Sequence, residues 1–219
     1  QTHPAMALAA SAPSLGVFDG SLAPLVDTFK LHSKPGSNRT IQLTFRGGPV
    51  HLSTMSPPRN AAPFDMDGRP GTFSDEELKT IQRIWQSIAE DYSPFDVDVT
   101  TDDVPPEALS RSSAKDETFG MEVVFTNHNG LYQQGTTGAA CFGCFKDYDN
   151  VLPVLVFENL GEVYSAELAS RMIGQTLGLS SDGKDGSAFW PGWSTGWGPM
   201  MGGIGAPIRQ FSKGEYDGA

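Results

Sequence analysis

Two segments of the chain carry the hydrophobic spacing of amphipathic helices. The first, residues 74–92, begins at a capping box formed by Ser74 and Glu77 and ends before Pro94. The second covers residues 165–177. In both, apolar residues recur every three or four positions, so each helix has one face that must pack on another element. They are Leu78, Ile81, Ile84, Trp85 and Ile88 in the first helix and Leu168, Ala169, Met172, Ile173 and Leu177 in the second.

Further segments have the alternation or the apolar runs of β-strands. Residues 40–45 and 95–101 alternate between apolar and polar positions, which is the two-residue period of a strand with one buried face. Residues 121–126 are more continuously apolar, as in a more buried strand, and residues 138–145 and 152–157 are also expected to be strands. The order strand, helix, strands, helix predicts an α/β fold.

The two ends of the chain differ from this periodic centre. Residues 1–38 carry Pro, Ser, Gly and Ala without sustained periodicity, which predicts an extended N-terminal arm. Residues 39–219 are expected to form a single domain, in which residues 180–219, rich in Gly, Trp and Ser, form a small irregular subdomain. The Ala-rich segment after Gln1 is interpreted as what remains after processing, so we expect a mature chain.

Composition and charge exclude several classes of function. Lys and Arg number 15 against 26 Asp and Glu, a net charge of −11, so the molecule as a whole repels a phosphate backbone and nucleic-acid binding is not expected. No stretch approaches the ~18–20 consecutive apolar residues that cross a bilayer, so we expect a soluble protein that does not span a membrane. Hydrophobic residues are 38% of the chain, and 25 Gly with 16 Pro indicate a loop-rich fold with a modest core.

The second predicted helix and the residues after it carry a known spacing. Gly178 lies seven residues after Arg171, and Met200 and Met201 follow downstream. This spacing resembles that of the metzincin zinc metalloproteases, whose signature H-E-x-x-H-x-x-G-x-x-H is followed by a methionine-containing turn beneath the metal. Gly178 matches the signature glycine, and Met200 or Met201 matches the turn.

Three other segments extend the resemblance from about residue 40 to the last residue. They are PFDMDGRPGTFSDEELKTIQRIWQSIAEDYSPFDVDVTT, LVFENLG and FSKGEYDGA, and they look like parts of a group of secreted bacterial and algal proteins with this protease fold. The resemblance implies a metzincin-like α/β fold, with a mixed, twisted β-sheet, two main helices and an irregular Gly- and Trp-rich C-terminal subdomain.

The functional positions of the signature are changed in this chain. Arg171 stands for the first His, Met172 for the catalytic Glu, Gln175 for the second His and Ser181 for the third. Arg171 is a cation without a lone pair, so it opposes Zn²⁺, and Met172 cannot take a proton from an attacking water. The resemblance therefore implies the fold of a protease without its activity. We expect a pseudoenzyme with no metal and no cofactor.

Arg171 has two interpretations at this stage. It follows Glu167 by four residues, which is the favourable orientation for an ion pair on a helix surface. Alternatively, its side chain fills the volume that metal and water would occupy and keeps the cleft packed.

Cys141 and Cys144 are the two cysteines of the chain and have C-x-x-C spacing. On a regular strand, residues three apart point to opposite faces, so a bond between them requires Gly143 to bend the chain. A local disulfide and a pair of thiols that are free or have other partners both stay open. Redox catalysis is not favoured, because the pair does not open a helix.

Trp190, Trp193 and Trp197 form an aromatic run in the C-terminal subdomain. Such a run can stack on sugar rings, form the aromatic centre of a protein interface, or form a local core. We expect at least one of the three to belong to the core and the others to contribute to an interface.

Two short motifs give weaker predictions. Asn38 and Thr40 belong to an N-glycosylation tripeptide, which matters in a chain that enters the secretory pathway. Asp65 and Asp67 resemble the start of a calcium loop, but the downstream ligands are missing, including the closing Glu, so no calcium site is expected.

These observations predict a catalytically inactive metalloprotease-like protein that serves as a structural or binding subunit of a larger protein assembly. Two other functions stay open. One is carbohydrate binding by the tryptophan run, and the other is a metalloprotease whose metal is held by substitute ligands. The expected partners are other protein subunits, with a glycan as the second class. The expected location is extracytoplasmic: outside the cell, at its surface or in an organelle lumen.

Overall fold

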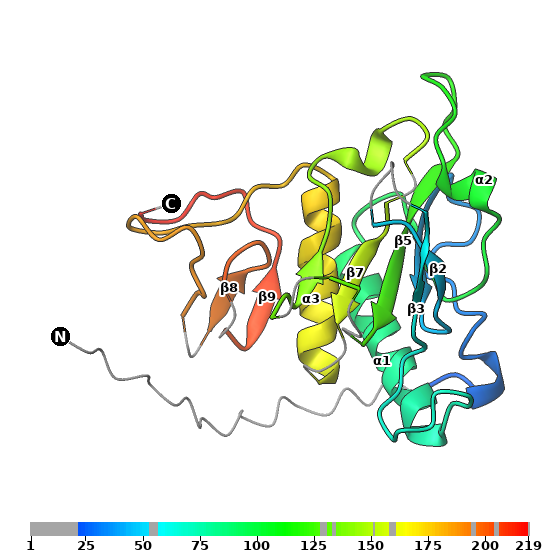
Figure 1. The fold of residues 1–219 in the computed structure, drawn as a ribbon. Coiled ribbons are helices and arrows are strands. Elements are labelled where there is room, and N and C mark those ends of the chain that lie inside the picture. Colours follow the sequence, from blue (N-terminus) through cyan, green and yellow to red (C-terminus); the bar gives the residue numbers. More distant parts are fainter. Residues whose placement is uncertain are drawn as a thin grey trace.

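A five-stranded sheet forms the centre of the molecule (Figure 1). The structure is a computed structural model, and it describes residues 22–52, 57–127, 131–132, 135–150, 152–157, 161–193, 196–203 and 206–218. The strand order is β4-β1-β5-β7-β6, with β6 antiparallel to β7 and the other neighbours parallel. The strands are β1 (Arg39–Thr44), β4 (Asp98–Thr100), β5 (Phe119–Thr126), β6 (Gly138–Ala139) and β7 (Val154–Phe157). The fold is therefore mixed α/β, as the sequence predicts.

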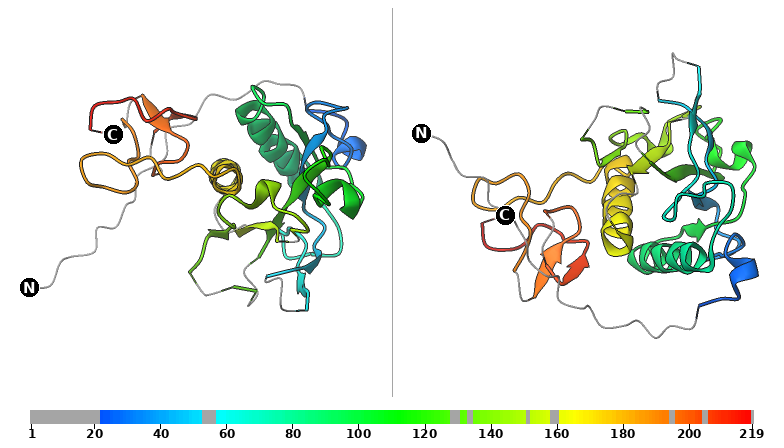
Figure 2. Two further views of the ribbon diagram at one scale, coloured as in Figure 1. Left: turned by 90° about the horizontal axis from the view of Figure 1, so that it is seen from above. Right: turned by 60° about the horizontal axis from the view of Figure 1, so that its bottom comes forward.

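Two long helices lie side by side on one face of this sheet (Figure 2). Helix α1 (Asp75–Asp91) begins at the predicted capping box, in which Ser74 and Glu77 bind each other's backbone N–H groups. Helix α3 (Glu162–Thr176) lies between the sheet and the C-terminal region, so one side of the helix packs on the sheet and the other side faces the C-terminal region. A third, short helix, α2 (Pro106–Leu109), lies in the connection before β5.

The main core fills the space between the sheet and the two long helices. Strand residues that alternate along β1, β5 and β7 point into it, and Ile81, Ile84 and Ile88 of α1 meet them with no more than 1% exposure. The opposite face of the sheet is covered by a hairpin of β2 (Gly48–Val50) and β3 (Arg59–Ala61). Val50 and Ala61 of this hairpin pack on Val124 and Leu155 in a second, smaller core. This hairpin was not predicted from the sequence.

The described part of the expected N-terminal arm, residues 22–38, packs on the sheet edge and on α1. The backbone N–H of Leu31 donates to Thr101 Oγ1 at 3.0 Å, and Gln82 Nε2 of α1 donates to Thr28 Oγ1 at 2.8 Å. A 3-10 helix (Leu25–Asp27) precedes these contacts. Residues 1–21 lie outside the described part of the chain.

Several element boundaries differ from the sequence predictions; β4, for example, begins at Asp98 rather than at residue 95. The expected strand over 138–145 stops at Ala139. It cannot extend to residue 145, because Gly143 has a left-handed φ of 71° and precedes a 3-10 helix (Cys144–Lys146). The second helix begins at Glu162, three residues earlier than predicted. Gly161 is its N-cap residue and has a φ of 79°, which lies outside the helical region.

The C-terminal region, residues 180–218, lies on the far side of α3 from the sheet (Figure 1). Among its described residues, the strands are a parallel pair, β8 (Trp197–Pro199) and β9 (Ile208–Gln210), and the others lie in turns, loops and one isolated bridge. No helix among the described residues combines the length and apolar character that a membrane span needs.

Candidate functional site

Helix α3 ends in a Schellman motif built around Gly178. The N–H of Leu179 donates to the carbonyl of Gly174 at 3.0 Å, and the N–H of Gly178 donates to the carbonyl of Gln175 at 2.9 Å. Gly178 has a φ of 89°, a conformation that glycine adopts without strain. This glycine therefore ends the helix and turns the chain toward the C-terminal region.

The turn that contains Met200 and Met201 packs directly on the outer side of α3. A Cβ atom at Gly174 would lie only 2.7 Å from Met201 Sδ, so the absence of a side chain at Gly174 permits this close approach. Met200 and Met201 are 1% and 3% exposed. The N–H of Asp182 also donates to the carbonyl of Met201, at 3.1 Å, which holds the chain after Gly178 against the turn.

The four changed signature positions lie in different surroundings. Arg171 is half-buried on the outer side of α3, where its Nη1 donates to the carbonyl of Gly202 at 3.5 Å. Met172 is 7% exposed and belongs to the main core, Gln175 is half-buried, and Ser181 is exposed. The structure thus places Arg171 on the methionine turn and directs Met172 into the core instead.

Arg209 is a second cation at this turn, and sequence reasoning missed it. Its side chain is only 4% exposed, and its Nη2 donates to the carbonyls of Pro199 and Met200 at 2.9 and 3.0 Å. Its Nη1 donates to the carbonyl of Gly203. The guanidinium group has a planar fork of donors, which suits a turn that presents several carbonyls. No pattern in the sequence around Arg209 marks it, because residues 180–219 were expected to be irregular.

Glu167 forms its ion pair with Arg209 rather than with Arg171. The Nε of Arg209 lies 3.7 Å from Glu167 Oε2, and among the described ion pairs none joins Glu167 to Arg171. The expectation from helical spacing was therefore wrong, because the C-terminal region brings a more deeply buried cation to the same carboxylate. Burial lowers the pKa of both arginines, and the charge of Glu167 partly restores that of Arg209.

A second partly buried carboxylate, Asp91, lies at the end of α1 beside Arg209 and Glu167. Ser170 Oγ of α3 donates to Asp91 Oδ2 at 2.6 Å, and the hydroxyl of Tyr92 donates to the carbonyl of Ser170 at 2.8 Å. Burial raises the pKa of Asp91 to about 6, and it also raises the pKa of Glu167. The two carboxylates and Arg209 thus form a charge network that joins α1, α3 and β9.

The tryptophan run folds into an aromatic cluster with Tyr216. The ring centroid of Trp190 lies 4.5 Å from that of Trp193 and 4.6 Å from that of Tyr216, and Trp197 packs at 6.2 Å from Trp190. Lys184 Nζ lies over the rings of Trp190 and Trp193 at 4.9 and 5.4 Å. Trp193 is nevertheless 51% exposed, so the cluster is both a local packing centre and a surface.

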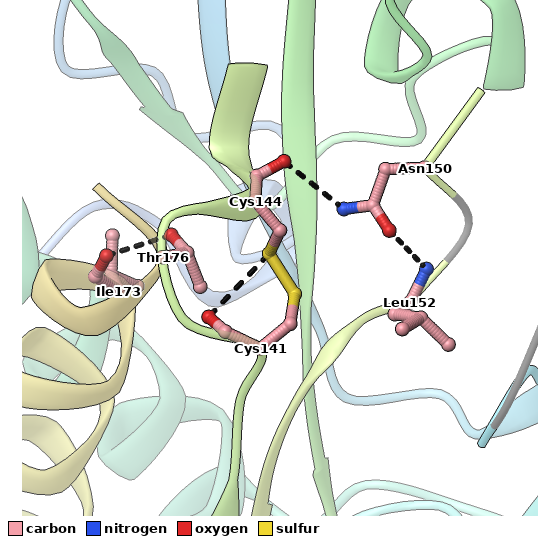
Figure 3. The surroundings of a disulfide bond; sticks show 6 residues. All are labelled: Cys141, Cys144, Asn150, Leu152, Ile173 and Thr176. Atoms are coloured by element: carbon pink, nitrogen blue, oxygen red, sulfur yellow. Dashed lines mark hydrogen bonds between the residues drawn. A yellow bond between two sulfur atoms is a disulfide. The ribbon is translucent and has the colours of Figure 1, made fainter. Parts of the chain in front are cut away.

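Cys141 and Cys144 are joined by a disulfide (Figure 3), one of the alternatives that the sequence left open. Gly143, in its left-handed conformation, bends the chain between them, as the spacing requires. The N–H of Gly143 donates to the carbonyl of Gln175 at 2.9 Å, so the loop is tied to the end of α3.

Two remaining candidates lie away from α3. Among the described residues, the carboxylates of Asp65, Asp67 and Glu77 come within 4.8 Å of one another, with Glu77 contributed by α1. The oxygens of Glu77 accept the N–H groups of Met66 and Ser74, both at 2.7 Å, so this carboxylate holds the turn before the helix. Asn38 is exposed at the start of β1.

No model of a known protein family matches the sequence, and no curated protein is significantly similar to it.

Proposed function

We propose that this protein is a catalytically inactive, metzincin-like protein that acts as a structural or binding subunit of a larger protein assembly. The likeness is supported by the mixed sheet, by the glycine that ends α3 and by the methionine turn packed on that helix at Gly174. These features occur together, at the sequence spacing that suggested the family.

The observation that carries the inactive state is the pair of guanidinium groups at the turn. Arg171 and Arg209 both donate to carbonyls of the methionine turn, and neither has a lone pair for a metal. Zinc in a catalytic site is held by imidazole, thiolate or carboxylate ligands. In this protein Arg171 and Arg209 connect α3 to the C-terminal region through Gly202 and Glu167, so cations stand beside the methionine turn.

The surface of the C-terminal region supports a role in binding another protein. Phe189, Trp193 and Ile208 are 47%, 51% and 57% exposed, and exposed aromatic side chains such as those of Phe189 and Trp193 anchor protein interfaces. Stacking on a sugar needs a free aromatic face, whereas Lys184 already lies over Trp190 and Trp193. We therefore favour a protein partner over a glycan. The Cys141–Cys144 disulfide supports an extracytoplasmic location, because disulfides persist in oxidising compartments.

The family likeness is tested by restoring the ligands. A variant with Arg171→His, Gln175→His and Ser181→His leaves Met172 in the core and provides three imidazoles. We expect it to bind one zinc ion per chain in native mass spectrometry, while the unchanged protein binds none. The matched control keeps Ser181 and is expected to bind zinc much more weakly. A folded triple variant without zinc affinity contradicts the metzincin-like geometry, and zinc in the unchanged protein contradicts the inactive state.

The subunit role is tested on the assembly. Protein extracted gently from its source is expected to appear in native mass spectrometry at the mass of a complex with other subunits. The Trp193→Ala variant is expected to dissociate from that complex and to appear at the mass of the single chain. Phe142→Ala is the matched control, because Phe142 is an aromatic residue that is 66% exposed on the disulfide loop, away from the tryptophan cluster. A free monomer in the native extract contradicts the proposal. Release by Phe142→Ala but not by Trp193→Ala places the interface elsewhere and contradicts the proposed surface.

A further inference from the structure

A cavity of about 330 Å³ opens where α1 and α3 end, next to the disulfide loop. None of the residues that line it belongs to the C-terminal region, so the cavity is separate from the cluster of Arg171 and Arg209 (the arginine cluster) and from the tryptophan cluster. Its size falls within the range of small-molecule sites, roughly 300–1,000 Å³. The lining residues are Arg39, Ile41, Tyr92, Phe95, Asp96, Val97, Phe119, Gly143, Phe145, Lys146, Thr176 and Leu177.

The interior of the cavity is apolar and its mouth exposes large hydrophobic side chains. Ile41, Tyr92 and Phe119 are at most 5% exposed and form part of its wall. Phe95 and Leu177, in contrast, are 44% and 43% exposed although both contribute to the lining. Phe95 packs one side of its ring near Tyr92 and Phe211, with ring centroids 5.8 and 6.0 Å apart, and still leaves much of its surface exposed. An apolar ligand in the cavity would remove the side chains of Phe95 and Leu177 from water.

The charge around the cavity is positive in a chain whose net charge is −11. Arg39 and Lys146 line it, and the guanidinium of Arg39 lies 4.2 Å from the centroid of Phe119. The one carboxylate among the described lining residues is Asp96, and it pairs with Lys34 Nζ at 2.8 Å. The Lys34 ammonium holds the pKa of Asp96 below its usual range, so its negative charge is already compensated. Arg39 contributes to this lowering less than Lys34 does, and among the described ion pairs none involves Arg39 or Lys146, so an anion at the rim would meet two cations without an ion-pair partner.

We propose that this cavity binds a small amphipathic anion, with an aliphatic or aromatic body and one carboxylate or sulfonate group. The body lies against Ile41, Tyr92 and Phe119, and the anionic group lies at the rim, near Arg39 and Lys146. This site goes beyond the proposed subunit function and does not depend on it. A neutral molecule of the same shape fits the apolar wall but gains nothing from the cations.

The disulfide loop supplies one wall of the site. Gly143, Phe145 and Lys146 line the cavity, and the loop is fixed by the Cys141–Cys144 bond and by the Gly143 to Gln175 hydrogen bond. Reduction of the disulfide is therefore expected to weaken binding of the anion.

The first test is a fluorescence titration of the full chain with 8-anilino-1-naphthalenesulfonate, followed by competition with octanoate and with 1-octanol. We expect saturable binding of one probe per chain and displacement by octanoate at concentrations at least about tenfold below those of octanol. Binding that does not saturate overturns the proposal, and so does equal displacement by the acid and the alcohol.

Charge variants at the mouth locate the site. Leu177 is exposed, so Leu177→Glu is expected to fold and to weaken binding of the probe at least about tenfold by repulsion, whereas Leu177→Gln keeps most of the affinity. Lys146→Gln is expected to weaken octanoate and leave octanol unchanged, and Lys115→Gln, at an exposed lysine outside the lining, is expected to do neither. Equal affinities of the Glu and Gln variants at position 177 overturn the proposed location.

Discussion

The sheet with its two long helices and the C-terminal region are held together by different forces. In the first, Ile84, Val99 and Val123 are fully buried, and apolar contact between helix and sheet fills the interior. In the second, Arg209 donates to backbone carbonyls and Trp190 meets other aromatic rings. A Gly- and Trp-rich segment without apolar periodicity therefore docks on α3 with few apolar side chains, chiefly Met201 and Phe211, and adds directional hydrogen bonds and ring contacts that a few substitutions can remove.

The largest expected effect is in the sheet-and-helix part. Ile84→Ala removes a fully buried side chain from α1 and leaves a cavity under the sheet, so we expect a loss of about 4 kcal/mol in the free energy of unfolding. Urea denaturation followed by far-UV circular dichroism measures it. Val163→Ala on α3, where the side chain is 50% exposed, is the control and should change stability by less than about 0.5 kcal/mol. Similar losses of unfolding free energy in the two variants would show that burial of apolar side chains is not the main source of stability in the sheet-and-helix part.

The sheet and the two long helices could be predicted well from the sequence, because the spacing of their apolar residues is a local pattern. The capping box, the helical face of α1 and the alternation of β1 each follow from neighbouring residues, and the structure has all three. The β2–β3 hairpin was missed because its pairing joins short segments across a Pro-rich connection. The arginine cluster was missed for a stronger reason. The contact between Arg209 and Glu167 spans 42 residues and depends on how two regions dock, which no local pattern encodes.

The C-terminal region should respond most to the loss of its buried cation. Arg209→Met keeps much of the side-chain volume but removes the donors to Pro199 and Met200 and leaves Glu167 without its partner, so we expect a loss of about 3 kcal/mol. The loss should be local. Hydrogen exchange is expected to rise in residues 182–218 and to stay unchanged in β5.

The comparison variant for Arg209 is Arg59→Met, which changes an exposed arginine of β3. It should leave exchange in the C-terminal region unchanged. If Arg209→Met raises exchange equally in β5 and in residues 182–218, the two regions unfold as one unit and the difference between them is not one of local stability.

The disulfide loop lies at the border between the two regions and should have a smaller effect. Its bond closes a loop of four residues, for which chain entropy predicts a stabilisation of about 2 kcal/mol. A reducing agent should therefore lower the melting temperature of the unchanged protein. The double variant Cys141→Ala, Cys144→Ala should melt at that lower temperature whether or not the reducing agent is present. A melting temperature that reduction does not change would mean that the Gly143 to Gln175 hydrogen bond alone fixes the loop.

The smallest effect concerns Asp91, where the apolar part and the charge network meet. Its pKa is raised from 3.8 to about 6, mainly by burial, so the folded chain holds a proton that the unfolded chain releases between these values. The contribution of Asp91 to the free energy of unfolding is fully present below pH 3.8 and is lost as the pH rises through about 6. Between pH 5 and pH 8 we expect a loss of about 1 to 1.5 kcal/mol.

Asp91→Asn removes this titration while its amide oxygen can still accept the hydrogen bond from Ser170 Oγ. Urea denaturation at pH 5 and pH 8 should show a smaller drop in the variant than in the unchanged protein. The remaining slope should include Glu167, whose pKa is also raised by burial despite the nearby charge of Arg209. Equal slopes in both proteins would mean that Asp91 stays charged when folded, with Arg209 and Ser170 compensating its burial. The charge network of Asp91, Glu167 and Arg209 would then stabilise the junction of α1, α3 and β9 at neutral pH. Charged contacts would in that case stabilise the edge of the sheet-and-helix part as well as the C-terminal region.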